Sequence, residues 1–133
     1  AADSPAPAIR ILTYNIHHGE GSDGVFDLPR LARVIASAAP DLVALQEVDG
    51  PEAAALVFPA ARYRFCFTAA RAVQNTGFAI RRGIPYRCGA DYTPLALGAR
   101  LRRGATLVLY PGTAAAVHLL GVHLNLRGLG IGT

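Results

Sequence analysis

The chain has 133 residues, 52% of them hydrophobic, which is enough for one domain with a buried core. Its net charge of +4 comes from 13 arginines without any lysine, and these are dispersed rather than gathered into a basic stripe, so the composition does not indicate a nucleic-acid-binding surface. No apolar run approaches the roughly 18–20 residues of a membrane span, which excludes a transmembrane helix.

The first half of the chain alternates strands and helices. Residues 1–8 are rich in Ala and Pro and are expected to form a flexible tail. β-branched and aromatic residues then predict a strand, and Asp27 is expected to cap a helix that ends before Pro40. A continuous apolar run predicts a second strand, buried on both faces. These elements and a second short helix are expected over Ile9–Ile16, Leu28–Ala39, Leu42–Gln46 and Pro51–Val57.

The second half of the chain predicts a series of strands separated by glycine and proline turns. We expect these strands at Tyr63–Phe67, Gly77–Ile80, Tyr86–Cys88, Leu95–Leu97, Ala105–Leu109 and Val117–Leu124. The order strand, helix, strand and then further strands indicates an α/β fold with a mixed β-sheet and outer helices. Residues 9–133 are therefore expected to form a single domain.

Polar side chains stand at the ends of three of these strands. Asn15 ends the first strand, and Glu47 follows the second. Because alternate side chains of a strand share a face, Glu47 is expected on the same face as Val43 and Leu45. Three apolar strands that become polar at their C-terminal ends predict one pocket. We expect the pocket to be surrounded by Asn15, Glu47, His123 and Asn125.

These residue types suit a hard divalent cation and a phosphate ester. Glu47 offers an anionic oxygen to Mg²⁺, with Mn²⁺ as an alternative, and Asn15 offers an amide oxygen or a donor that orients the substrate. His123 is suited to donate a hydrogen bond to a phosphoryl oxygen or to act as an acid. For each residue taken singly the alternative is structural, namely a solvated strand end, an edge hydrogen bond or a histidine satisfied within the fold.

Three further features leave alternatives open. His17 and His18 line the same cleft or form an exposed turn, and a zinc site is not expected there without further spaced ligands. Asn75 either reaches the substrate or forms the turn before a strand, which we favour. Cys66 and Cys88 either form a disulfide or remain two buried thiols.

Three motifs resemble those of the endonuclease/exonuclease/phosphatase superfamily. They are Thr13-Tyr14-Asn15-Ile16-His17-His18-Gly19, Pro40-Asp41-Leu42-Val43-Ala44-Leu45-Gln46-Glu47-Val48-Asp49 and Gly121-Val122-His123-Leu124. The segment 75–80 resembles a further strand of that family. The resemblance covers roughly residues 9–124 and is carried mainly by the first two motifs.

The resemblance implies a four-layer α/β/β/α sandwich, of which this chain supplies half or more, with a divalent-metal site at one end. By analogy, Asn15 and Glu47 match metal- and phosphate-site positions, and His123 matches a histidine that contacts the scissile phosphate in many members. Members hydrolyse phosphodiesters or phosphomonoesters by in-line attack of an activated water. The expected substrate is therefore a phosphate ester, and nucleic acid is one such class that the sequence does not specifically indicate.

Two motifs typical of the superfamily, Gly-Asp-x-Asn and Ser-Asp-His, do not occur up to Thr133, so the domain is expected to be incomplete at its C-terminus. We therefore expect a metal-dependent phosphoesterase whose 133 residues alone have very low activity and associate through an uncovered sheet. The alternative is an inactive domain or truncated product that binds a partner or a phosphate-bearing ligand. The Pro-rich start suits an exported protein, with a cytoplasmic one as the alternative.

Overall fold

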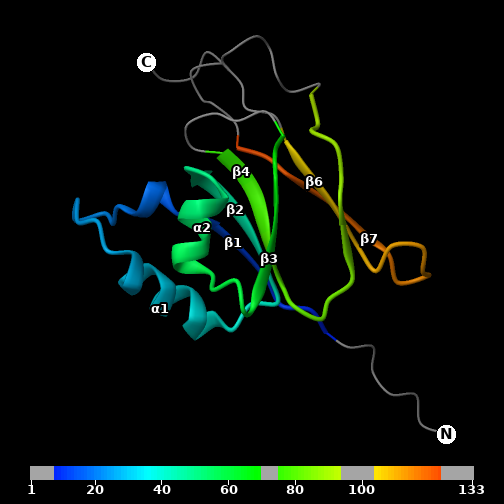
Figure 1. Cartoon of the computed structure of the whole chain (residues 1–133), viewed down its shortest axis with the longest axis horizontal. Coiled ribbons are helices and arrows are strands. Elements are labelled where there is room, and N and C mark those ends of the chain that lie inside the picture. The colour runs from blue at the N-terminus through cyan, green and yellow to red at the C-terminus, as the bar shows by residue number, and fades with distance from the viewer. Residues whose placement is uncertain (1–7, 70–74, 94–103, 124–133) are drawn as a thin grey trace, which may run out of the picture.

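Two β-sheets lie face to face, and two helices cover the outer face of the first sheet (Figure 1). The computed structural model describes residues 8–69, 75–93 and 104–123. A short 3-10 helix, η1 (His17–Gly19), follows the first strand. The other elements are β1 (Ile11–Asn15), α1 (Leu28–Ala38), β2 (Leu42–Val48), α2 (Pro51–Val57), β3 (Tyr63–Phe67), β4 (Asn75–Arg81), β5 (Tyr86–Cys88), β6 (Ala105–Leu109) and β7 (Val117–Gly121).

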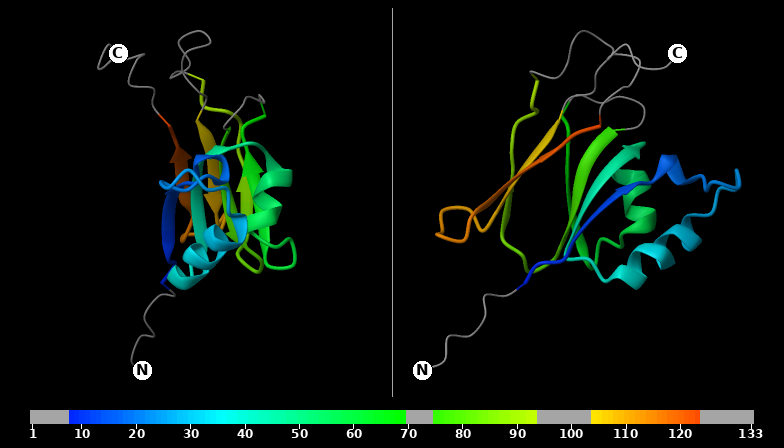
Figure 2. Two further views of the ribbon diagram at one scale, coloured as in Figure 1. Left: turned by 90° about the vertical axis from the view of Figure 1, so that its left-hand side faces the viewer. Right: turned by 180° about the vertical axis from the view of Figure 1, so that it is seen from behind.

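The first sheet is mixed, with the strand order β1-β2-β4-β3, and the second is antiparallel, with the order β5-β6-β7. Strands β1 and β2 are parallel and are connected by α1, while the remaining pairs are antiparallel. The predicted α/β fold with a mixed sheet and outer helices is confirmed. Within the described residues the helices cover one sheet only, which corresponds to three layers of an α/β/β/α sandwich (Figure 2).

Local signals fix the ends of α1 as the sequence predicts. The Oδ1 atom of Asp27 accepts a hydrogen bond of 2.9 Å from the backbone N–H of Arg30, which caps the helix, and a proline occupies its first turn. The helix ends at Ala38, and the next residue, Ala39, adopts the left-handed conformation with φ of 46° directly before Pro40. Helix α1 therefore begins and ends within the connection from β1 to β2.

Each face of the first sheet packs against a core of its own. On the helix-covered face, Val43, Leu45 and Ala79 pack with residues of α1 and α2. On the inner face, which faces the second sheet, Phe78 and Ile80 pack with residues of β6 such as Leu107. The second strand is therefore apolar on both sides because it is buried on both sides, as predicted.

A disulfide between Cys66 of β3 and Cys88 of β5 joins the two sheets, with 5.5 Å between the Cα atoms. Of the two alternatives that the sequence leaves open, the structure contains the disulfide. The pairing crosses from one sheet to the other rather than linking neighbouring strands of one sheet. The bond therefore ties the layers together in addition to their apolar core.

Several strand ends differ from the sequence prediction. Strand β4 begins at Asn75, two residues before the predicted start, because Asn75 pairs with Val48 and the backbone N–H of Thr68 bonds to the carbonyl of Thr76. Asn75 therefore lies in a strand, and the turn that we favoured for it is wrong. The predicted strand at 95–97 and the tail at 1–7 lie outside the described residues.

Several apolar side chains at the edge strands are exposed, among them Ile11 of β1, with 51% of its surface accessible, and Leu120 of β7, with 47%. Self-association through such a surface stays a prediction. Within the described part of the chain, no helix has the length and apolar character needed to cross a membrane.

Candidate active site

The C-terminal ends of β1, β2 and β7 lie at the same end of the molecule, towards the top of Figure 1. Asn15, Glu47 and His123 belong to these three ends. The first two come from parallel neighbours of one sheet, and the third follows a strand of the other sheet. Asn125, the fourth residue expected here, lies outside the described residues.

Strand β2 contains a β-bulge just before its end. Its pairing with β4 passes from Leu45 opposite Gly77 to Val48 opposite Asn75, so two residues of β2 stand against one of β4. Glu47 lies inside this bulge with φ of 58°, in the left-handed region. This conformation costs a residue with a Cβ atom about 1–2 kcal/mol. Strain of this kind persists where the surrounding structure enforces it, and it is common at functional sites.

The bulge changes the face on which Glu47 lies. Val43, Leu45 and Val48 all belong to the core on the helix-covered face. Glu47 does not join them, because its Oε1 atom lies 3.4 Å from Nε2 of His123, which follows β7 of the second sheet. The predicted shared face of Glu47, Val43 and Leu45 is therefore wrong. Strict alternation fails at the bulge, and the carboxylate turns towards the inner face.

Glu47 and His123 form a partly buried pair between the sheets. The side chain of Glu47 is 16% exposed and that of His123 is 22% exposed. A carboxylate held here experiences a lower effective dielectric than at an open surface, which strengthens its interaction with a cation. A protonated His123 would be one such cation, and a divalent metal ion would be another.

Asn15 occupies the exposed end of β1. Its Oδ1 atom accepts a hydrogen bond of 2.9 Å from the backbone N–H of His17, which fixes the orientation of the amide. The amide N–H groups of Asn15 are thereby turned away from that bond. Directly opposite Asn15 on the neighbouring strand, the side chain of Gln46 donates to Thr13 Oγ1 at 3.3 Å. The end of β1 therefore carries several polar groups on one face.

Two buried polar residues of β4 lie next to the bulge that contains Glu47. The Nδ2 atom of Asn75, which is 4% exposed, donates to the carbonyl of Val48 at 3.2 Å and so holds the chain just after the bulge. Thr76 lies across from the bulge and is 1% exposed. Among the described residues no hydrogen-bond partner exists for its Oγ1 atom. A buried hydroxyl without a partner costs about 1–3 kcal/mol, and the sequence reasoning did not single it out.

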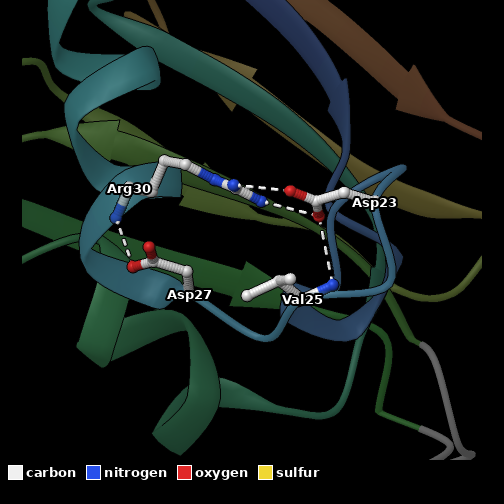
Figure 3. A network of polar contacts seen from close by, with 4 residues as sticks. All are labelled: Asp23, Val25, Asp27 and Arg30. Carbon is white, nitrogen blue, oxygen red and sulfur yellow. Dashed lines mark hydrogen bonds and ion pairs between the residues drawn. The ribbon is translucent and has the colours of Figure 1, made fainter.

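A cavity of about 520 Å³ opens beside the end of β1. Its walls include Asn15, His17 and Glu20 together with the loop that leads into α1. That loop is clamped by Arg30, whose guanidinium donates two hydrogen bonds to the carboxylate of Asp23 at 2.8 and 3.1 Å (Figure 3). The hydrogen bond from Arg30 lowers the pKa of Asp23 to about 2. Glu47 and His123 are not among the residues that line this cavity.

A sequence model of the Endonuclease/Exonuclease/phosphatase family matches residues 12–127. The chain belongs to this family. The matched region contains Asn15, Glu47 and His123, so the end of the molecule described above is part of the family's common domain. The resemblance inferred from the three sequence motifs is thereby confirmed. A search of curated proteins gave no match.

Solved structures of family members share the fold. Truncated TDP2 from Caenorhabditis elegans is 18% identical, with a TM-score of 0.69 over 88% of this chain and 46% of that one. An endonuclease/exonuclease/phosphatase from Beutenbergia cavernae DSM 12333 is 26% identical, with a TM-score of 0.54 over 87% of this chain and 38% of that one. A family protein from Leptotrichia buccalis C-1013-b is 19% identical, with a TM-score of 0.52 over 90% and 56%. The chain therefore spans between 38% and 56% of these proteins.

Proposed function

We propose that this chain contributes the Glu47 half of a divalent-metal-dependent phosphoesterase site. The observation that carries the proposal is the bulge, in which the strained backbone of Glu47 directs a partly buried carboxylate towards His123 of the other sheet. A carboxylate that needed only solvent would not require a left-handed backbone. Membership of a family of phosphoester hydrolases and nucleases supports the same conclusion.

The donor set at this end of the molecule fits a hard cation. It contains a carboxylate, a carboxamide and a buried hydroxyl, from Glu47, Asn15 and Thr76. Oxygen ligands of this kind suit Mg²⁺, which keeps several waters and needs only one or two carboxylates, and Mn²⁺ accepts the same ligands. When bound, such an ion neutralises charge on the phosphate and lowers the pKa of a coordinated water.

The protein groups have distinct roles in this proposal. Glu47 holds the cation through its carboxylate, and Asn15 either adds its amide oxygen or donates its amide N–H groups to a phosphate oxygen. His123 donates a hydrogen bond from its ring to a phosphoryl oxygen, where negative charge accumulates as the ester bond breaks. The substrate-binding roles predicted for Asn75 and Asn125 stay predictions.

Metal binding is the direct test, because the chain spans only 38% to 56% of the solved family members and binding can be measured without turnover. Mn²⁺ binding to the whole chain, followed by electron paramagnetic resonance, is expected to fall about tenfold or more in Glu47→Gln. Glu52→Gln is the matched control, since Glu52 is exposed on α2, and it is expected to bind as the parent does. Parent-like Mn²⁺ affinity in Glu47→Gln would refute the metal role of Glu47.

Activity provides the second readout. Hydrolysis of bis(p-nitrophenyl) phosphate by the longest available chain is expected to require Mg²⁺ or Mn²⁺. It is expected to be lost in Glu47→Gln and reduced about 10²-fold in His123→Gln, the usual scale for one acid or hydrogen-bond donor. Turnover in Glu47→Gln equal to that of the parent contradicts the proposal.

A further inference from the structure

The turn after β1 holds a second cluster of metal-ligating side chains. Among the described residues, His17, His18 and Glu20 form a group whose ligand atoms all lie within 4.8 Å of one another. The Nε2 atom of His18 lies 3.2 Å from Oε2 of Glu20, and the rings of His17 and His18 are stacked with centroids 4.8 Å apart. Glu20 is the further spaced ligand that the sequence alone did not identify.

The backbone brings the two histidines together. His17 and His18 both have φ of 44°, the left-handed conformation that costs a residue with a Cβ atom about 1–2 kcal/mol. Two such residues in succession turn both imidazoles to the same side of η1. The ring of His18 also stacks on Phe26, with centroids 5.3 Å apart and an interplanar angle of 13°, which restricts its rotation.

Glu20 is held by the loop that follows. It pairs with Phe26 in an isolated antiparallel bridge, and the backbone N–H of Gly21 bonds to the carbonyl of Val25 at 2.9 Å. The Asp23–Arg30 clamp then fastens the tip of this loop to α1 (Figure 3). His18 and Glu20 are therefore positioned by hydrogen bonds and stacking before any ligand arrives, which favours a preorganised site.

We propose that His17, His18 and Glu20 bind a divalent transition metal of the zinc type, separate from the Mg²⁺ proposed at Glu47. Two imidazoles and one carboxylate are a ligand set of three-ligand zinc sites, and imidazole nitrogen suits Zn²⁺ but not Mg²⁺. Bond lengths of about 2.0–2.2 Å to a tetrahedral ion place ligand atoms about 3.4 Å apart. The pair formed by His18 and Glu20 already has nearly this separation, whereas the exposed His17, whose ring is stacked on that of His18, has to rotate to turn a ring nitrogen towards the ion.

The proposed ion would lie at the rim of the cavity that Asn15 lines, because His17 and Glu20 belong to the same wall. With three protein ligands, a tetrahedral ion keeps one position for water or an anionic oxygen. The site would therefore add a second cation next to the place where a phosphate ester is proposed to bind.

The test is Zn²⁺ binding by the whole chain in excess Mg²⁺, measured by competition with a chromophoric chelator. One equivalent is expected to bind, and Co²⁺ in its place is expected to give the visible absorption of a four-coordinate ion. His17→Gln, His18→Gln and Glu20→Gln are each expected to weaken Zn²⁺ binding tenfold or more. His118→Gln is the matched control, because His118 is exposed on β7, and it is expected to leave the affinity unchanged.

Glu47→Gln separates this site from the other one, since it should weaken the proposed Mg²⁺ binding tenfold or more and retain Zn²⁺ binding. Circular dichroism of each variant checks that the fold is intact, and Glu20→Gln preserves the size of the side chain. Absence of Zn²⁺ binding by the parent, parent-like affinity in all three ligand variants, or loss of Zn²⁺ in Glu47→Gln alone would each overturn the proposal.

Discussion

The left-handed backbone at Glu47 makes a quantitative prediction about stability. Glu47→Ala and Glu47→Gly both remove the carboxylate and its contact with His123, so the difference between them reports the backbone alone. Alanine retains the cost of φ near 58°, about 1–2 kcal/mol, whereas glycine does not. Glycine in turn makes the unfolded chain less ordered, which offsets about 0.4–1 kcal/mol of that advantage. We expect Glu47→Gly to be more stable than Glu47→Ala by about 0.8 kcal/mol.

For a chain of 133 residues this free energy corresponds to a difference in Tm of about 3 °C. Urea unfolding and thermal unfolding of the two variants measure it. Ala44→Gly provides a control in the same strand, because Ala44 has no positive φ, and glycine in an ordinary strand position costs about 0.5–1 kcal/mol. The sign of the glycine effect should therefore reverse between the two positions. If Glu47→Ala proves as stable as Glu47→Gly, the strained bulge is not present in solution and the reasoning that begins from it is refuted.

Two further predictions concern the disulfide and the loop clamp. The disulfide of Cys66 with Cys88 closes a segment with a sequence separation of 22, so its reduction is expected to lower the free energy of unfolding by about 3 kcal/mol. An unchanged urea midpoint after complete reduction, verified by thiol titration, would contradict this. Because the pKa of Asp23 is lowered to about 2 in the folded protein, the clamp to Arg30 is at full strength above pH 3.8 and weakens as the pH falls through 2. The protection of the amides of residues 20–26 against hydrogen exchange, measured relative to an unfolded peptide at the same pH, should fall over that range in the parent. In Asp23→Asn this protection should be low at every pH.

The sequence predicts the elements well because the signals for them are local. Asp27 and Pro40 delimit α1 by capping and by steric exclusion, which require no knowledge of the rest of the fold. The apolar run of β2 correctly predicts burial on both faces. Glu47 and His123 come within 3.4 Å of each other, whereas a single pocket that they share with Asn15 stays a prediction.

The errors occur where the structure depends on pairing between distant segments. Alternation along β2 assigns Glu47 to the wrong face, because the bulge is defined by the register with β4 and leaves no sign in the apolar pattern. Thr76 could not be singled out for the same reason, since its burial and lack of a partner follow from that register. The grouping of Glu20 with two histidines likewise depends on left-handed residues in η1 that only the folded backbone reveals.

The disulfide between β3 and β5 also has a consequence for the contact between Glu47 and His123. Glu47 belongs to one sheet, whereas His123 follows a strand of the other, so any separation of the layers pulls this pair apart. Both sheets belong to one chain, in which β5 follows β4 after a short turn, and the disulfide adds a second covalent connection between them. This second connection limits how far the layers can separate, and we expect it to return Glu47 and His123 to the same pairing after any transient opening.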